Sequence, residues 1–182
     1  MTSTDARFAE LYESNFKHVH AYCRRRVSSD RVDDAAAETF LVAWRKIDRV
    51  PEGSETLPWL YAVAYGVVSN FWRGASRQKR LNKKLDAIGV EPSAPADEFV
   101  VVRQETRQIL AALAKLRKAD QEVLRLSIWE ELSNAELAVV LDVAVDAARQ
   151  RLSRARRNLA DQYNRLDSEI PDSPVAQKGG AL

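Results

Sequence analysis

The sequence predicts an all-α protein with two small helical domains joined by a flexible linker, the second domain ending in a helix-turn-helix. Three observations predict this fold. Apolar residues recur at helical spacing along most of the 182 residues, and no stretch alternates convincingly like a strand. A segment with two prolines and small residues, 89–97 (GVEPSAPAD), interrupts the pattern. A short break between two helical stretches near the C-terminus has the spacing of a helix-turn-helix.

The composition excludes several classes of protein. Hydrophobic residues make up 46% of the chain and charged residues 30%, which is typical of a globular protein with a core. No apolar run approaches the roughly 18–20 residues that cross a bilayer, and the N-terminus lacks the pattern of a secretory signal. Cys23 is the only cysteine, so no intrachain disulfide is expected. We therefore expect a cytoplasmic protein without membrane contact, metal or cofactor.

The first domain is expected over residues 8–85 and contains three predicted helices. They run from 8 to 27, from 32 to 50 and from 59 to 84, with a loop at 51–58. The apolar positions that predict the first helix are Phe8, Leu11, Tyr12, Phe16, Val19, Tyr22 and Cys23. The buried face predicted for the second helix consists of Ala36, Phe40, Ala43, Trp44 and Ile47.

The second domain is expected over residues 105–165, after a linker at 86–104. Four helical segments are predicted between residues 99 and 163. The tail, 166–182, contains two prolines and a Gly-Gly pair, and we expect it to be disordered.

The helix-turn-helix is predicted at residues 133–152. Ser133 and Glu136 have the spacing of a capping box, which starts a short helix. Asp142 and Val143 then interrupt the apolar pattern, and a second helix begins by about Asp146. Two helices separated by so short a turn are typical of a DNA-binding motif.

The second helix of this motif has an unusually basic face. Ala148, Leu152, Ala155 and Leu159 form a narrow apolar seam. The residues on the remaining, solvent-facing arc are Arg149, Gln150, Ser153, Arg154 and Arg157. A merely solvated face usually mixes acids with bases, whereas the stretch from 149 to 157 holds five arginines and no acid. We therefore favour DNA binding over a solvated face.

A second basic cluster, residues 73–84, follows an aromatic-rich stretch, LPWLYAVAYGVVSNFWR. Aromatic rings interleaved with cations suit single-stranded nucleic acid, because bases stack on rings while cations follow the backbone. Most of these aromatics are equally expected in a core. We favour the core for Tyr61, Phe71 and Trp44, and leave Trp59, Tyr65 and Trp72 open.

The order of these parts resembles a bacterial RNA polymerase sigma factor of the extracytoplasmic-function (ECF) type. FAELYESNFKHVHAYCRRRV resembles the opening helix of that family, and DRVDDAAAETFLVAWRKI its polymerase-binding helix. LPWLYAVAYGVVSNFWR is similar to its promoter-melting segment, and ADQEVLRLSIWEELSNAELAVVLDVAVDAARQRLSRARRNL to its final domain. The sequence departs from the family pattern at Tyr65-Gly66, where Arg-Asn is common, and at Asp142, where glycine is usual.

The resemblance implies a transcription initiation factor that does not itself catalyse a reaction. Its partners would be core RNA polymerase and promoter DNA, both as duplex and as melted strand, with an anti-sigma factor as a further candidate. The implied polymerase-binding residues are Asp33, Asp34, Glu38, Thr39, Phe40 and Trp44. The implied −10 and melting contacts are Trp59, Tyr65, Trp72, Arg73, Arg77, Lys79 and Arg80. The implied −35 contacts are Arg149, Gln150, Ser153, Arg154 and Arg157.

Two other functions agree less well with the sequence. A stand-alone helix-turn-helix regulator would bind a symmetric operator tightly without polymerase, but the first domain shows no heptad seam or obvious pocket for a ligand. An enzyme acting on nucleic acid lacks support, because the sequence has no paired histidine and carboxylate set, no metal-ligand spacing and no glycine-rich phosphate loop.

Overall fold

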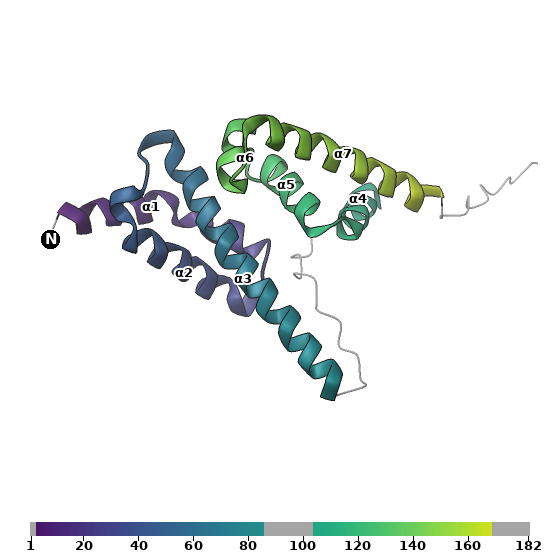
Figure 1. Ribbon diagram of the computed structural model, residues 1–182, viewed down its shortest axis with the longest axis horizontal. Helices are drawn as coiled ribbons and strands as arrows, with labels where there is room; N and C mark the ends of the chain where they lie inside the picture. The colour runs from purple at the N-terminus through teal and green to yellow at the C-terminus, as the bar shows by residue number, and fades with distance from the viewer. Residues whose placement is uncertain (1–2, 86–103, 169–182) are drawn as a thin grey trace, which may run out of the picture.

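A computed structural model describes residues 3–85 and 104–168, and the described residues are helices joined by short turns (Figure 1). Most of the predicted linker and tail lie outside the described residues. One residue of the predicted linker, Gln104, is described and begins a helix. Residues 166–168 of the predicted tail are described and end another helix.

The N-terminal bundle consists of α1 (Ser3–Arg24), α2 (Val32–Arg45) and α3 (Thr56–Leu85), each of which packs against the other two. The sequence predicted a second helix to residue 50, but α2 ends at Arg45. Lys46 leaves the helical region of φ and ψ, and a single 3₁₀ turn (Ile47–Arg49) follows. Ile47 is still buried in this turn. The pattern of buried apolar residues therefore extends beyond the end of the helix, which is why the helix was predicted too long.

The buried face of α2 differs from the prediction at Trp44. Ala36, Phe40 and Ala43 are buried as predicted, whereas Trp44 is 39% exposed. Its ring meets the edge of Phe8 at a centroid distance of 4.9 Å. The prediction that Trp44 belongs to the core is therefore wrong, because the side chain lies at the outer edge of the contact between α1 and α2.

The C-terminal bundle consists of α4 (Gln104–Lys115), α5 (Lys118–Ile128), α6 (Asn134–Leu141) and α7 (Val145–Ser168). The long helix α7 packs against the other three. Four helices were predicted here, and four are present among the described residues. The core of this bundle includes Leu124, Leu126, Leu137 and Leu152, all buried.

The two bundles are in contact with each other, an arrangement that the sequence did not predict. In Figure 1, α6 lies beside α3, and the two helices contact each other directly. The buried apolar residues of both bundles form one continuous cluster. Of the candidates on α3, Trp59, Tyr65 and Trp72 pack against this cluster.

Candidate nucleic-acid interface

The exposed face of α7 carries the predicted basic surface. Ala148, Leu152 and Ala155 are buried and Leu159 is half-buried, as the apolar seam predicted. The five predicted contact residues, Arg149, Gln150, Ser153, Arg154 and Arg157, are all exposed. Two more arginines, Arg151 and Arg156, are exposed on either side of the seam. This face is free to meet a ligand, and its side chains donate hydrogen bonds but offer few acceptors.

An acid of the same helix is paired with this face. The Arg149 Nη2 is 3.2 Å from a carboxylate oxygen of Asp146, one helical turn earlier. Both side chains are exposed, so the pair is weak. Arg149 can therefore exchange this carboxylate for a phosphate or a base edge at little cost.

The turn before α7 has the geometry of a helix-turn-helix. The Ser133 hydroxyl accepts a hydrogen bond from the Glu136 amide, and the Glu136 carboxylate accepts one from the Ser133 amide, which completes the predicted capping box. Asp142 adopts the left-handed conformation, with φ 51° and ψ 55°. Asp tolerates this region better than most residues other than glycine, which explains how it serves where the family pattern has glycine.

On α3, the three aromatic candidates already make contacts within the protein. Trp59, Tyr65 and Trp72 are half-buried and pack against the core. The Trp72 indole donates a hydrogen bond to the Arg26 carbonyl at 3.0 Å. Tyr61 is buried, as predicted. These rings can stack on bases only through the edges that they leave exposed in this arrangement.

The basic end of α3 is described in part. Arg73 is exposed, and its guanidinium donates to the Asn70 side chain at 2.6 Å. The helix continues to Leu85, but the side chains of Arg77, Lys79 and Arg80 lie outside the described residues.

The candidates on α2 divide into exposed acids and buried side chains. Asp33, Asp34 and Glu38 are exposed, and an Asp33 oxygen lies 3.1 Å from the His20 Nε2. Thr39 is fully buried, and its hydroxyl donates to the Ala35 carbonyl at 2.8 Å. Phe40 is buried as well. Thr39 does not reach the surface as a contact residue would, and Phe40 is reached only from the groove between α1 and α2.

An apolar groove runs between α1 and α2. Its volume is about 520 Å³, and the acid Asp33 is among its lining residues. The other lining residues are Phe8, Tyr12, Phe16, Ala37, Phe40, Leu41 and Trp44. Exposed aromatic side chains around a groove are typical of surfaces that bind another protein.

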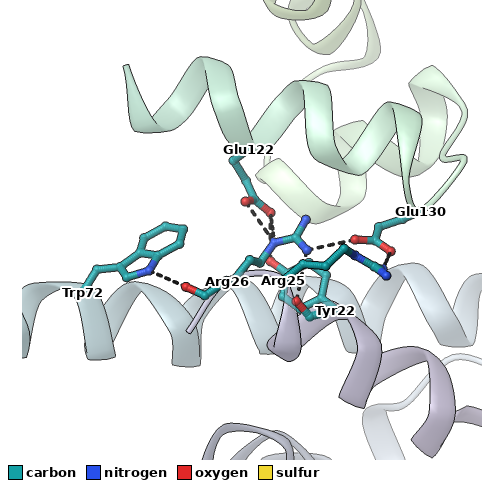
Figure 2. A network of polar contacts seen from close by, with 6 residues as sticks. All are labelled: Tyr22, Arg25, Arg26, Trp72, Glu122 and Glu130. Atoms are coloured by element: carbon teal, nitrogen blue, oxygen red, sulfur yellow. Dashed lines mark hydrogen bonds and ion pairs between the residues drawn. The ribbon is translucent and has the colours of Figure 1, made fainter. Parts of the chain in front are cut away.

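A buried charge cluster lies where the two bundles meet, and the sequence analysis missed it (Figure 2). The Arg26 Nε donates to both carboxylate oxygens of Glu122 at 3.0 Å. Its Nη1 donates to Glu130 at 2.9 Å, and Arg25 donates to the other Glu130 oxygen. The Tyr22 hydroxyl donates to Glu122 at 2.9 Å. The side chains of Arg26, Glu122 and Glu130 are at most 1% exposed.

The environment of this cluster shifts the pKa of its neighbours. Burial raises the pKa of Tyr22 well above its usual value of 10.0, and the charge of Glu122 adds to the increase. Burial raises the pKa of Tyr61 to about 12, with a further contribution from Glu130. Burial also raises the pKa of Cys23 to about 11. All three groups are held in their neutral forms at physiological pH.

Two family models match the two bundles separately. Residues 11–78 match the model described as sigma-70 region 2, and residues 106–159 match the model described as sigma-70, region 4. The chain belongs to the sigma-70 family of RNA polymerase sigma factors. A sigma factor confers promoter recognition on core polymerase through these two regions and is not itself an enzyme.

Individual relatives agree with this assignment. The chain is 26% identical over 172 residues to the ECF sigma-E factor of Escherichia coli, covering 89% of this chain and 90% of that protein. It is 28% identical over 134 residues to the probable sigma factor RfaY of Xanthomonas campestris, covering 71% of this chain but only 33% of RfaY. The sigma factor is therefore of the ECF type.

A solved structure shares the fold. The sigma factor RpoE of Bartonella quintana, crystallised in complex with the anti-sigma factor NepR, matches with a TM-score of 0.62 and 22% identity. The match covers 86% of this chain and 96% of RpoE.

The described residues contain neither a membrane-spanning helix nor a cluster of metal ligands. Within the helices of the described ranges, none is both long and apolar enough to cross a membrane. Among the residues that the structure describes, no three histidine, cysteine or acidic side chains gather as metal ligands would.

Proposed function

We propose that this ECF sigma factor binds the −35 element through the exposed arc of α7, the −10 element and melted strand through α3, and core polymerase through α2 and the adjacent groove. The observation that carries the proposal is the division of α7 into a buried apolar seam and an exposed basic arc. The turn before α7 supports a helix-turn-helix, which places such a helix in the major groove.

The α7 arc supplies the means to read DNA. Arg149, Arg154 and Arg157 offer forked donors that suit phosphates and guanine edges, and Gln150 offers both a donor and an acceptor. Ser153 adds a small polar contact near the centre of the arc. The first exposed turns of the helix therefore recognise the upstream element.

For α3, we propose that Trp59, Tyr65 and Trp72 stack on bases of the melted strand, and that Arg73, Arg77, Lys79 and Arg80 follow its backbone. Stacking of each base on an aromatic ring contributes about 1–3 kcal/mol. The placement of the aromatic side chains ahead of the basic end of the same helix supports this division.

For polymerase binding, we propose that Asp33, Asp34, Glu38 and Trp44 contact the polymerase at the surface. Thr39 and Phe40 support the contact from below by holding α2 against its bundle, because both are buried. The apolar groove with an acidic residue in its lining supports a docking surface with an apolar centre and a polar rim.

We further infer a cytoplasmic location, since the factor works with polymerase on DNA. An anti-sigma factor is proposed as an additional partner, with the complex of RpoE and NepR as support. Co-purification of the tagged chain from its native cells, followed by competition of the recovered protein against core polymerase, tests that partner.

The −35 proposal is tested with two matched double variants of the full chain. Arg149→Ala/Arg154→Ala removes two charges from the arc, whereas Arg151→Ala/Arg156→Ala removes two charges from its flanks. Transcription by reconstituted holoenzyme from a −35-dependent promoter is expected to fall at least tenfold for the first variant and less than threefold for the second. Equal losses in both variants would indicate general electrostatic attraction instead of recognition by the arc.

The polymerase proposal is tested with Leu41→Ala/Trp44→Ala, which truncates two exposed groove residues. Val42→Ala is the control, because Val42 is half-buried on the same helix and does not line the groove. Affinity for core polymerase is expected to fall at least tenfold for the double variant and less than threefold for the control. Unchanged affinity together with tight binding of duplex DNA alone would favour a stand-alone regulator.

A further inference from the structure

An acidic side chain lies at the end of α7 that a helix-turn-helix directs toward the bases of DNA. Asp146 is the second residue of the helix, and its side chain is 83% exposed. At about 3.6 residues per turn, Asp146 is offset by about 60° from Arg149 and by about 20° from Ser153, so the three residues share one side of the helix. The exposed arc of α7 therefore begins one turn before its arginines, with a carboxylate.

We propose that Asp146 is a specificity-determining residue for the −35 element. Its carboxylate accepts a hydrogen bond from the N4 amino group of a cytosine, and it orients Arg149 toward a guanine in the neighbouring base pair. The inference rests on the proposed binding of the −35 element by α7, and it names part of the base sequence that is recognised there. Asp146 was not among the contact residues expected from the sequence, which begin at Arg149.

The contact between Asp146 and Arg149 leaves both side chains able to bind bases. A guanidinium has five N–H donors, and a carboxylate has two oxygens that each accept more than one hydrogen bond. The bond of 3.2 Å from the Arg149 Nη2 to the Asp146 Oδ1 uses one donor and one oxygen. Arg149 keeps enough donors for the O6 and N7 of a guanine, the pair of acceptors that suits a forked donor. The second oxygen of Asp146 stays available for a cytosine.

The spacing of the two side chains matches the spacing of stacked bases. Three residues of helix separate Asp146 from Arg149, which is a rise of about 4.5 Å along the axis of α7. The tips of the two side chains are closer, with the carboxylate oxygen and the guanidinium nitrogen 3.2 Å apart. Successive bases of one strand lie about 3.4 Å apart. A charged acceptor and a charged donor at this separation suit two neighbouring base pairs.

The negative charge of Asp146 restricts which group of the DNA can face it. Phosphates repel a carboxylate, so this side chain does not serve as a contact to the DNA backbone. In the major groove guanine presents two acceptors, thymine an acceptor and a methyl group, and adenine an acceptor beside its amino group. Cytosine presents its amino group alone. Cytosine is therefore the base that gives the carboxylate a donor without an opposing acceptor.

The same charge gives a strongly basic helix a means to discriminate between sequences. Exposed arginines such as Arg149, Arg154 and Arg157 are attracted to the phosphates of any DNA. A carboxylate among them loses its hydration at every site where no amino group replaces the water, which weakens binding to those sites. Specificity is the difference between the affinities for right and wrong sites, so a penalty at wrong sites increases it.

The experiment measures the base preference of holoenzyme reconstituted with the full chain. Promoters with a randomised −35 element and a fixed −10 element are offered to the holoenzyme, and the bound promoters are recovered and sequenced. Asp146→Ala is the test variant. Asp161→Ala is the matched control, because it removes the same charge from an exposed position about four turns later on α7. A purely structural role of Asp146, through the dipole of the helix, would change the stability but not the choice of bases.

The parent and Asp161→Ala are expected to prefer cytosine at least fivefold at one position, next to a position that prefers guanine. Asp146→Ala is expected to lower the cytosine preference below twofold and to weaken the guanine preference beside it. An unchanged profile in Asp146→Ala, or the same change in Asp161→Ala, would overturn the inference and leave the binding of the −35 element by α7 standing. A parent without any preference in the randomised element would overturn both conclusions.

Discussion

The indole nitrogen of Trp72 donates a hydrogen bond to the backbone carbonyl of Arg26 across 3.0 Å. Arg26 lies two residues beyond the end of α1, where the helix no longer supplies its carbonyl with a partner. A side chain on α3 therefore fixes the backbone that carries Arg26, the buried arginine of the charge cluster. Helix α3 and the charge cluster are therefore parts of one connected structure.

Replacing Trp72 with phenylalanine is expected to lower the free energy of unfolding by about 1 kcal/mol, because it leaves the partly buried Arg26 carbonyl without its donor. Urea unfolding followed by circular dichroism measures the change. Trp59→Phe, at another half-buried indole of α3, serves as the comparison. The hydrogen bond would be unimportant if the two variants unfold at the same urea concentration.

Asp142→Gly is expected to raise the melting temperature, because glycine adopts φ 51° without the penalty that a side chain incurs. The gain is at most about 1 kcal/mol, since Asp already tolerates this region comparatively well. Asp146→Gly, the same replacement in the first turn of α7, is expected to lower the stability by about 1 kcal/mol. Calorimetry is expected to show changes in melting temperature of opposite sign for the two variants. Changes of the same sign would contradict backbone strain at Asp142.

The Cys23 thiol is expected to react slowly with a disulfide reagent in the native protein. Its pKa of about 11, against an ordinary value of 9.0, reduces the thiolate at pH 8 by on the order of a hundredfold, and burial slows access further. Absorbance of the released thiol measures the rate in buffer and in denaturant. A native rate within tenfold of the denatured rate would show that the thiol is accessible.

Alkaline pH is expected to destabilise the fold through Tyr22. The pKa of Tyr22 is raised in the folded protein. Its contribution to the free energy of unfolding is therefore fully present below its usual pKa of about 10. Above that pH the unfolded chain loses this proton first, and the free energy of unfolding falls as the pH rises. Tyr22→Phe removes the titrating group, so its stability should decline less between pH 10 and 11. Parallel curves for the two proteins would exclude Tyr22 as the cause.

The C-terminal bundle was the more predictable part of the fold, because its signals are local. The seam of Ala148, Leu152 and Ala155 and the capping box at Ser133 depend on residues within one or two helical turns of each other. The prediction for Trp44 was wrong for the opposite reason. Whether an aromatic side chain at the edge of an apolar stripe is buried depends on the neighbouring helix.

The charge cluster was not predictable from local pattern. Arg26 follows two other arginines and matches a solvated helix end, yet its side chain is fully buried. Its partner Glu122 is 96 positions away, and nothing in the spacing of either residue indicates the other. The sequence equally gives no indication that three successive polar residues of α5 are buried, namely Asp120, Gln121 and Glu122. Docking of the bundles explains the burial of Glu122, whereas Asp120 and Gln121 are satisfied within their own bundle, Asp120 by Asn158 and Gln121 by the carbonyls of Ala114 and Leu116.

The sequence separation within the cluster has a consequence for how the protein is made. During synthesis at about 5–20 residues per second, the 96 residues between Arg26 and Glu122 take roughly 5–20 seconds to follow. Once Leu85 completes α3 within that interval, the N-terminal bundle exists on the ribosome without Glu122 and Glu130 to pair with its arginines and without α6 against α3. The N-terminal bundle of each newly made chain is therefore exposed on this side before the C-terminal bundle can dock on it.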